Sequence, residues 1–277
     1  MRTAYLASQA AGSDQGAETP DWLLERLHAE FGFDFDPCPA SWHPGCEWSG
    51  LEVAWGACTY VNPPFDACEA WLRKGAAEQA RGKTSVFLIP ARPWTIYWRD
   101  VVWEYASEVR ILDQTVAFKG YKEQLPTALA LVIFYGASAP LRMLDRPSRQ
   151  ARLLPAPEGS LAGLVAMLRS VGYELPTVLI GPLVPLTEAV AQWQRAPEQP
   201  LVLVFAARLE SRHFQSAVLP HADDLYFATP VLKSDQGTRL FTGSCVAVFD
   251  RDLTRRAALS AKATHTLLVS AYDAKRM

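Results

Sequence analysis

The first half of the chain alternates a helical hydrophobic pattern with short apolar runs that are typical of strands. Four apolar residues recur at intervals of three and four and predict a helix with one buried face: Leu23, Leu24, Leu27 and Phe31. The dipeptide Thr19-Pro20 precedes this pattern. We expect Thr19 to be the N-cap residue of the helix and Pro20 its first helical residue.

Short apolar runs bounded by turn residues predict the strands of the same half. These runs are Phe33–Asp36, Tyr60–Val61, Ser85–Ile89, Val109–Leu112 and Ala128–Tyr135. We expect the last two to form an antiparallel edge. Helices that alternate with strands are typical of an α/β fold, in which helices cover a mostly parallel sheet.

The hydrophobic pattern of the first half recurs in the second half at an offset near 116 residues. The matched pairs include Val86–Arg92 with Val202–Arg208, Val101–Leu112 with Ala217–Ala228, Leu129–Phe134 with Ser244–Phe249, Tyr60–Phe65 with Leu179–Val184, and Phe31–Phe35 with Val171–Leu175. The nearly constant spacing favours an internal duplication over a chance likeness of two α/β units.

The composition agrees with an α/β fold and indicates the compartment in which the protein works. Half of the residues are apolar, and none of the apolar runs approaches the roughly 20 residues of a membrane helix. Five cysteines are an odd number, which is a poor basis for a disulfide framework. We expect a soluble protein of the cytoplasm.

Charge is divided unevenly between the halves. Residues 1–140 carry a net charge of −6 and the remainder +4, which gives the total of −2. A basic run of Arg142, Arg146, Arg149 and Arg152 lies among prolines and predicts a linker over residues 141–156, either solvated or facing phosphate. If the protein binds nucleic acid, the second half is the better candidate for contacts with the phosphate backbone of the nucleic acid.

Three residues with chemical potential follow predicted strands: Asp36, Asn62 and Arg92. Open α/β sheets bind ligands at the carboxyl ends of their strands. In Asn62-Pro63-Pro64-Phe65 the two prolines fix the backbone and remove two donors, so the turn is rigid and rich in acceptors. The Asn62 amide oxygen and a proline carbonyl can accept both hydrogens of an amine, and the Phe65 ring can stack on a base.

Less specific interpretations remain for Asn62 and Arg92. The Asn62 segment can be a plain exit from a strand, and Arg92 can be an ion-paired or capping residue. Cys38, His43, Cys46 and Cys58 do not have the spacing of a standard zinc site, so we expect no metal.

The first half resembles the phage-type DNA N6-adenine methyltransferases. The resemblance covers nearly all of residues 18–135 and is carried by Glu18-Thr19-Pro20, Phe31-Gly32-Phe33, Asp36-Pro37-Cys38-Pro39, Gly50-Leu51, Trp55-Gly56, Tyr60–Phe65, Trp71, Lys74, Gly82-Lys83 and Leu88–Arg92. It implies a Rossmann-like methyltransferase fold, S-adenosyl-L-methionine (SAM) as the methyl donor and DNA as the partner.

The resemblance also implies roles for individual residues. Catalysis is expected of Asn62, Pro63, Pro64 and Phe65; cofactor binding of Thr19, Pro20, Asp36, Pro37 and Cys38; and nucleic-acid binding of Lys74, Arg92, Arg208 and Arg212. The alternatives are another amine (adenine in RNA, cytosine N4 or a protein glutamine) and a non-catalytic protein that binds nucleic acid or serves as a scaffold.

The second half lacks the residues of the catalytic motif. In the alignment of the halves, Gly181 stands opposite Asn62 and Val184 opposite Phe65, and most of the segment between Asp36 and Tyr60 has no counterpart. We therefore expect a catalytic domain at 1–140, a linker at 141–156 and a degenerate methyltransferase-like domain at 157–277. The chain would be a monomer with an internal pseudo-dimer, or a homodimer.

Overall fold

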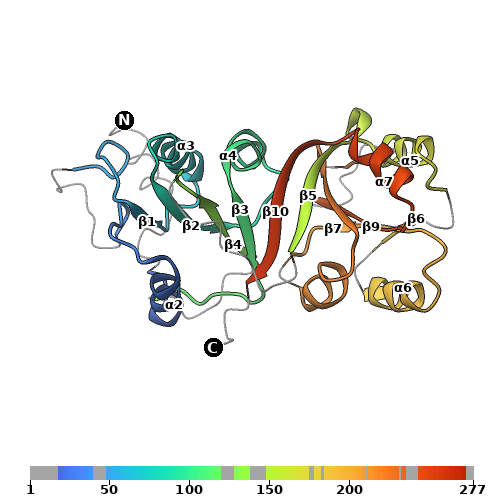
Figure 1. Cartoon of the computed structure of the whole chain (residues 1–277), viewed down its shortest axis with the longest axis horizontal. Helices are drawn as coiled ribbons and strands as arrows, with labels where there is room; N and C mark the ends of the chain where they lie inside the picture. Colours follow the sequence, from blue (N-terminus) through green and yellow to red (C-terminus); the bar gives the residue numbers. More distant parts are fainter. Residues whose placement is uncertain are drawn as a thin grey trace. The chain divides into compact units, whose positions relative to one another are not determined.

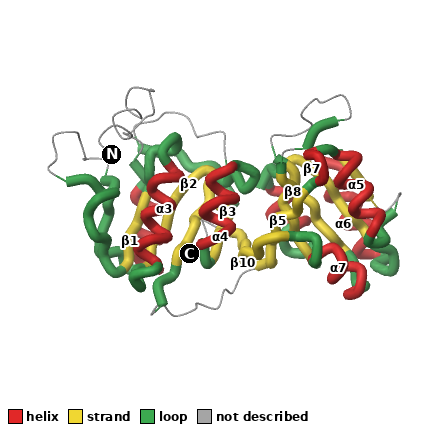
Figure 2. The backbone as a smooth tube through the Cα atoms, turned by 90° about the horizontal axis from the view of Figure 1, so that it is seen from above, coloured by secondary structure: helices red, strands yellow, loops and turns green. Residues whose placement is uncertain are grey.

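The computed structural model describes residues 18–39, 48–119, 128–137, 148–174, 178–181, 184–209, 211–230, 232–234 and 243–272, and it is a mixed α/β structure. Its contacts divide the chain into two compact units. The first unit comprises residues 1–91, 100–143 and 272–277, and the second comprises residues 92–99 and 144–271. Figure 1 and Figure 2 show that the strands of each unit lie side by side, with helices outside them.

The first unit is built from four strands and the helices between them, counted over its described residues. In chain order these are α2 (Asp21–Phe31), β1 (Cys58–Val61), α3 (Cys68–Gln79), β2 (Thr84–Pro90), the π-helix η1 (Trp98–Val102), α4 (Trp103–Tyr105), β3 (Glu108–Leu112) and β4 (Leu129–Phe134). The residues of η1 are divided between the two units. The strand order is β1-β2-β4-β3, with β1 parallel to β2 and β4 antiparallel to both of its neighbours.

The two faces of this sheet are covered by different helices. Val86 and Leu88 of β2 lie in one core cluster with Leu23 and Leu27 of α2. Phe87 faces the other way, because a Cβ atom on Gly75 of α3 would lie only 2.6 Å from the Phe87 ring. The run of β2 is thus buried on both faces, which explains why its sequence is continuously apolar.

The second unit has the same plan with two additional strands. Its elements are β5 (Ser148–Pro155), the 3-10 helix η2 (Pro157–Gly159), α5 (Leu161–Ser170), β6 (Val178–Ile180), α6 (Val184–Arg195), β7 (Leu201–Ala206), the π-helix η3 (Phe214–Val218), β8 (Asp224–Thr229), β9 (Ser244–Phe249), α7 (Leu253–Ser260) and β10 (Thr264–Tyr272). The strand order is β10-β5-β8-β9-β7-β6.

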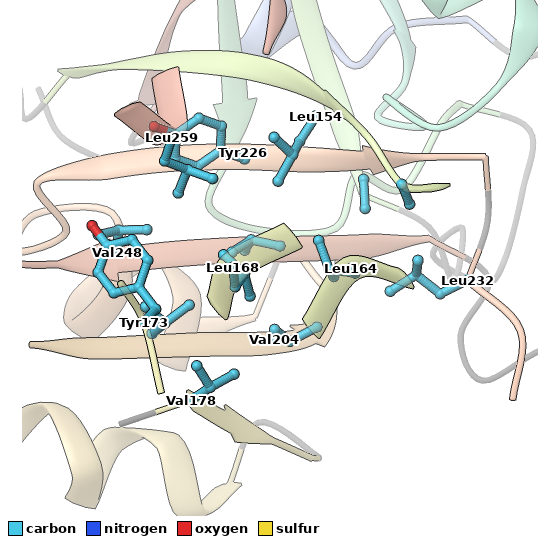
Figure 3. Packing of buried hydrophobic residues seen from close by; sticks show 14 residues of the cluster. Leu154, Leu164, Leu168, Tyr173, Val178, Val204, Tyr226, Leu232, Val248 and Leu259 are labelled. Atoms are coloured by element: carbon cyan, nitrogen blue, oxygen red, sulfur yellow. The ribbon is translucent and has the colours of Figure 1, made fainter. Parts of the chain in front are cut away.

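Helices also cover both faces of the second sheet. Figure 3 shows Leu164 and Leu168 of α5 in one buried cluster with Val204 of β7. On the opposite face, the Trp193 ring of α6 lies 5.4 Å from the Phe249 ring of β9, measured between centroids. Therefore α5 occupies the place in the second unit that α2 occupies in the first, and α6 that of α3.

The order β1-β2-β4-β3 of the first unit recurs in the second as β6-β7-β9-β8. The registers also agree: Val86 pairs with Ile133 and, in the second unit, Val202 pairs with Val248. The π-helices η1 and η3 stand at the same offset as the strands. The elements thus follow the spacing that the sequence pattern predicts.

The prediction of a linker over residues 141–156 is wrong for part of this range. Residues 148–155 form strand β5, which pairs with β8 on one side and β10 on the other. Buried Ala151 and Leu153 alternate with Arg152, whose guanidinium lies 2.9 Å from the Asp224 carboxylate. The prolines of this segment include the last residue of the strand, which tolerates proline better than a strand interior does. Arg142 and Arg146 lie outside the described residues.

Candidate active site

Asp36 and Asn62 follow neighbouring extended segments of the first unit. Phe35 forms a parallel bridge with Thr59 of β1, and the Tyr60 amide donates to the Phe35 carbonyl at 3.0 Å. The expected strand at residues 33–36 is thus reduced to a bridge beside β1. Because the two segments run parallel, Asp36 and Asn62 leave the sheet at the same carboxyl edge, where α/β sheets bind their ligands.

Thr19 does not cap helix α2, contrary to expectation. The helix begins at Asp21 with Pro20 in the N-cap position and without a side-chain cap. Thr19 Oγ1 instead shares a buried hydrogen bond of 2.6 Å with Tyr60 Oη. The Thr19 hydroxyl is thus bound by a residue 41 positions away and not by the amides of the helix.

The segment after Phe35 is held by a turn at Asp36. The Cys38 amide donates to Asp36 Oδ1 at 2.9 Å. Loss of surrounding water raises the pKa of Asp36 to about 6, although part of the residue stays exposed, and the Cys38 hydrogen bond acts in the opposite direction. Burial, with the nearby Asp36 charge, raises the pKa of the Cys38 thiol to about 12. Cys38 is therefore an inert thiol at neutral pH.

The Asn62 turn connects β1 to helix α3. Asn62 and Pro64 are half-buried, and Pro63 is buried. The Pro64 carbonyl accepts from the Ala67 amide at 2.9 Å, which ties the turn to the start of α3. The Phe65 ring meets the ring of buried Phe118 edge-on, with centroids 6.1 Å apart and an interplanar angle of 77°. Phe65 itself is half-buried.

Two further residues shape this site and were not predicted. Tyr60 of β1 is joined to Thr19 by the buried hydrogen bond described above, and burial raises the pKa of the Tyr60 hydroxyl. Gly50 packs against the Asp36 turn, since a Cβ atom there would lie 1.9 Å from the Pro37 carbonyl oxygen. Both residues belong to segments that carry the resemblance, but only the fold shows the contact of Gly50 with Pro37 and of Tyr60 with Thr19.

The expected nucleic-acid contacts have different environments. Lys74 Nζ lies 2.6 Å from the buried Glu78 carboxylate and 5.9 Å from the Trp55 ring centroid, so it is committed within the fold. Arg92, Arg208 and Arg212 are exposed. Arg92 and Arg208 follow β2 and β7 at equivalent positions. We therefore withdraw Lys74 from the candidate contacts and retain the arginines.

The second unit differs at the equivalent strand end. Tyr60 pairs with Val86 in the first unit and Val178 with Val202 in the second, so Asn62 corresponds to Ile180. The predicted match to Gly181 is wrong by one residue, because a sheet register is not visible in a short apolar run. Among the described residues none pairs with the outer edge of β6, where the first unit has the Phe35 segment.

The described part of the chain contains no group of three or more residues that could hold a metal ion. His43 and Cys46 lie outside it. None of its helices is long and apolar enough to cross a membrane. Comparisons of the chain with known protein families, with curated proteins and with solved structures found no match.

Proposed function

We propose that the chain is a SAM-dependent methyltransferase that modifies the N6 amine of adenine in DNA. The observation that carries the proposal is the common edge at which Asp36 and Asn62 leave parallel segments. One residue suits a cationic donor and the other suits an amine, and they stand at neighbouring strand ends of an α/β sheet.

Asp36 fits the methyl donor. SAM carries a sulfonium and an ammonium group and no phosphate, so a carboxylate suits it better than a glycine-rich phosphate loop. Within the described ranges Asp36 has no ion-pair partner; loss of surrounding water raises its pKa, and the Cys38 amide offsets only part of this effect. Bound there, SAM would supply an electrophilic methyl group.

The Asn62 turn fits the acceptor amine. Pro63 and Pro64 lack amide hydrogens, so the turn presents acceptors without competing donors, and the bond from the Ala67 amide to the Pro64 carbonyl fixes its shape. The Asn62 amide oxygen and a proline carbonyl of the turn would accept the two amine hydrogens and orient the nitrogen lone pair toward the methyl group. Phe118 packs against the Phe65 ring, and part of the Phe65 side chain stays accessible for stacking with a flipped base.

The proposal includes a duplicated Rossmann-like architecture with a degenerate second copy. The repeated strand order and the paired π-helices support the duplication. Ile180 in place of Asn62 supports the loss of catalysis in the second unit. Its exposed Arg208 and Arg212 favour a role in holding the DNA backbone.

The test is incubation of the chain with methyl-labelled SAM and, separately, with DNA, RNA and a protein mixture. DNA is then digested to nucleosides and analysed by mass. We expect N6-methyl-2′-deoxyadenosine from DNA. Label at cytosine N4, in RNA or in protein glutamine would show that the acceptor is one of these amines and not adenine N6 of DNA. The absence of transfer to DNA, RNA and protein would remove the methyltransferase assignment.

The binding of SAM should depend on the charge of Asp36. Because its carboxyl has a pKa of about 6, it is ionised at pH 7 and mostly protonated at pH 5. A cationic ligand prefers the ionised form, so we expect affinity to fall about tenfold between pH 7 and pH 5. Calorimetric titration should also give one SAM per chain.

Asp36→Asn should bind SAM weakly at pH 7 and lose this pH dependence. Glu25→Gln, an equal charge change at an exposed site on α2, is the matched control and should behave like the parent. Parental affinity in a folded Asp36→Asn protein would remove Asp36 from the cofactor site, and two SAM per chain would contradict a degenerate second unit.

A further inference from the structure

Strand β6 is the last strand in the order of the second unit and turns backbone polar groups away from β7 (Figure 1). The Gly181 amide donates inward to the Val204 carbonyl of β7 at 3.2 Å. Because the backbone groups of successive residues alternate between the two sides of a strand, those of Val178 and Ile180 point outward. Over the parts of the chain that the structure describes, this side of β6 pairs with no other strand. We call residues 178–180 the β6 edge.

The β6 edge exposes two large apolar side chains. Leu179 is 38% exposed and Ile180 is 41% exposed. The register equivalent of Leu179 in the first unit is Val61 of β1, which is fully buried. The same position of the fold is therefore covered in one copy and exposed in the other.

In the first unit, a segment from before β1 occupies the equivalent edge. Phe35 forms the parallel bridge with Thr59, and its carbonyl accepts from the Tyr60 amide. Tyr60 belongs to the core on the α2 side, so Thr59 and Val61 face α3. The Phe35 side chain faces α3 as well, because residues paired across a sheet lie on the same face. The Trp48 ring extends this cover, with its centroid 6.4 Å from that of Phe35.

The second half lacks this cover in its sequence. Most of the residues that lie between Phe35 and Tyr60 have no counterpart before β6. Native proteins often protect an edge strand with charged side chains or proline, and Val178–Ile180 contains neither. The residues after position 140 carry a net charge of +4, which favours a partner of negative charge.

We propose that the β6 edge binds an extended, acidic segment of a partner protein, which joins the sheet as a strand parallel to β6. Its backbone pairs with the outward groups of Val178 and Ile180, as the Phe35 segment pairs with β1. A large apolar side chain at the position of Phe35 covers Leu179 on the α6 side. In such strand additions the main-chain hydrogen bonds provide affinity and alternate side chains provide selectivity. The inference concerns the second unit alone and does not depend on methyl transfer.

The probe is a fluorescently labelled peptide that copies residues 31–37, Phe-Gly-Phe-Asp-Phe-Asp-Pro, and so includes the segment that pairs with β1. Its binding to the full chain is measured by fluorescence anisotropy without SAM or DNA. We expect saturable binding to the parent chain. The peptide change Phe35→Ser should weaken binding by about tenfold or more, because it removes the aromatic side chain that is buried on Leu179.

Two variants of the chain locate the bound peptide. Ile180→Pro removes the outward amide and retains the inward bond of Gly181, and proline is tolerated on a strand edge. Leu179→Ser removes an exposed apolar side chain and no backbone group. Each should weaken peptide binding by about tenfold or more. Ile180→Val, which retains the amide and an apolar side chain, should match the parent, as should Leu253→Ser, which removes a 72% exposed leucine of α7.

The absence of saturable binding to the parent, or equal binding by the parent and Leu179→Ser, would overturn the proposal. Sedimentation of the chain alone tests a second copy as the occupant. A dimer that Ile180→Pro converts to a monomer would show that β6 pairs with another copy of itself, and this result would also overturn the proposal. A chain that transfers no methyl group would leave the peptide measurements unchanged, so the two proposals fail separately.

Discussion

Replacement of Asn62 by alanine should slow methyl transfer to DNA by about 100- to 1,000-fold and leave SAM affinity within a few-fold. The Asn62 amide oxygen is expected to hold the acceptor amine, and the donor is expected to bind at Asp36. The loss should therefore occur in the rate of single-turnover methylation with saturating SAM, while calorimetric titration of SAM stays close to that of the parent.

The second unit supplies the matched control for this change. Ile180 is the register equivalent of Asn62, so Ile180→Ala alters the same position of the fold without removing an amide. It should leave the methylation rate unchanged. Asn62→Ala activity within threefold of the parent would exclude the amine-binding role of the turn.

Replacement of Arg110 by leucine should destabilise the first unit by about 3–5 kcal/mol. The Arg110 side chain is fully buried, and its guanidinium lies 2.7 Å from the Glu108 carboxylate and 2.5 Å from that of Glu30. Tyr135 Oη donates to Glu108 in the same network at 3.0 Å. The variant leaves two carboxylates without their cation, one of them buried.

The measurement is urea unfolding followed by a signal of the first unit, such as retained SAM binding. Arg73→Leu is the control, because Arg73 pairs with Glu69 where both side chains are about half exposed, and such pairs contribute less than about 1 kcal/mol. The double change Arg110→Leu with Glu108→Leu should recover part of the loss. A loss from Arg110→Leu no larger than that from Arg73→Leu would show that the network does not stabilise the unit.

The strands of the first unit could be predicted because their physical signals are local. The apolar run before Pro90 gives β2, and the run at 128–135 gives β4, each within one or two residues. The antiparallel pairing of β3 with β4 was also predicted and is confirmed. Burial on both faces requires a continuous apolar sequence, and the short length of each run with its flanking turn residues marks it as a strand.

Non-local contacts could not be predicted in this way. Thr19 has the sequence context of an N-cap but binds Tyr60, which lies 41 positions away. The Lys74–Glu78 ion pair is local, at i,i+4 spacing in α3, but the burial of the Glu78 side chain depends on the fold. The strand at 148–155 was hidden by charged residues such as Arg152, whose charge is paired with Asp224.

At the candidate site, the sequence located the residues that leave strand ends but not their neighbours. Asp36 and Asn62 could be placed at one edge because parallel strands end together. The contact of Gly50 with Pro37 depends on the path of a loop, for which a local pattern carries no signal.

Tyr272, at the end of β10, belongs to the core of the first unit. It is fully buried in the cluster of Leu23 and Leu27, its carbonyl accepts from the Asp113 amide at 3.2 Å, and the Arg26 guanidinium lies 5.1 Å from its ring centroid. During synthesis, the ribosome must therefore translate the whole second unit before the first can close its core. A nascent chain that stops after β4 would expose the surface that Tyr272 covers, so the first unit should mature only after translation has passed residue 272.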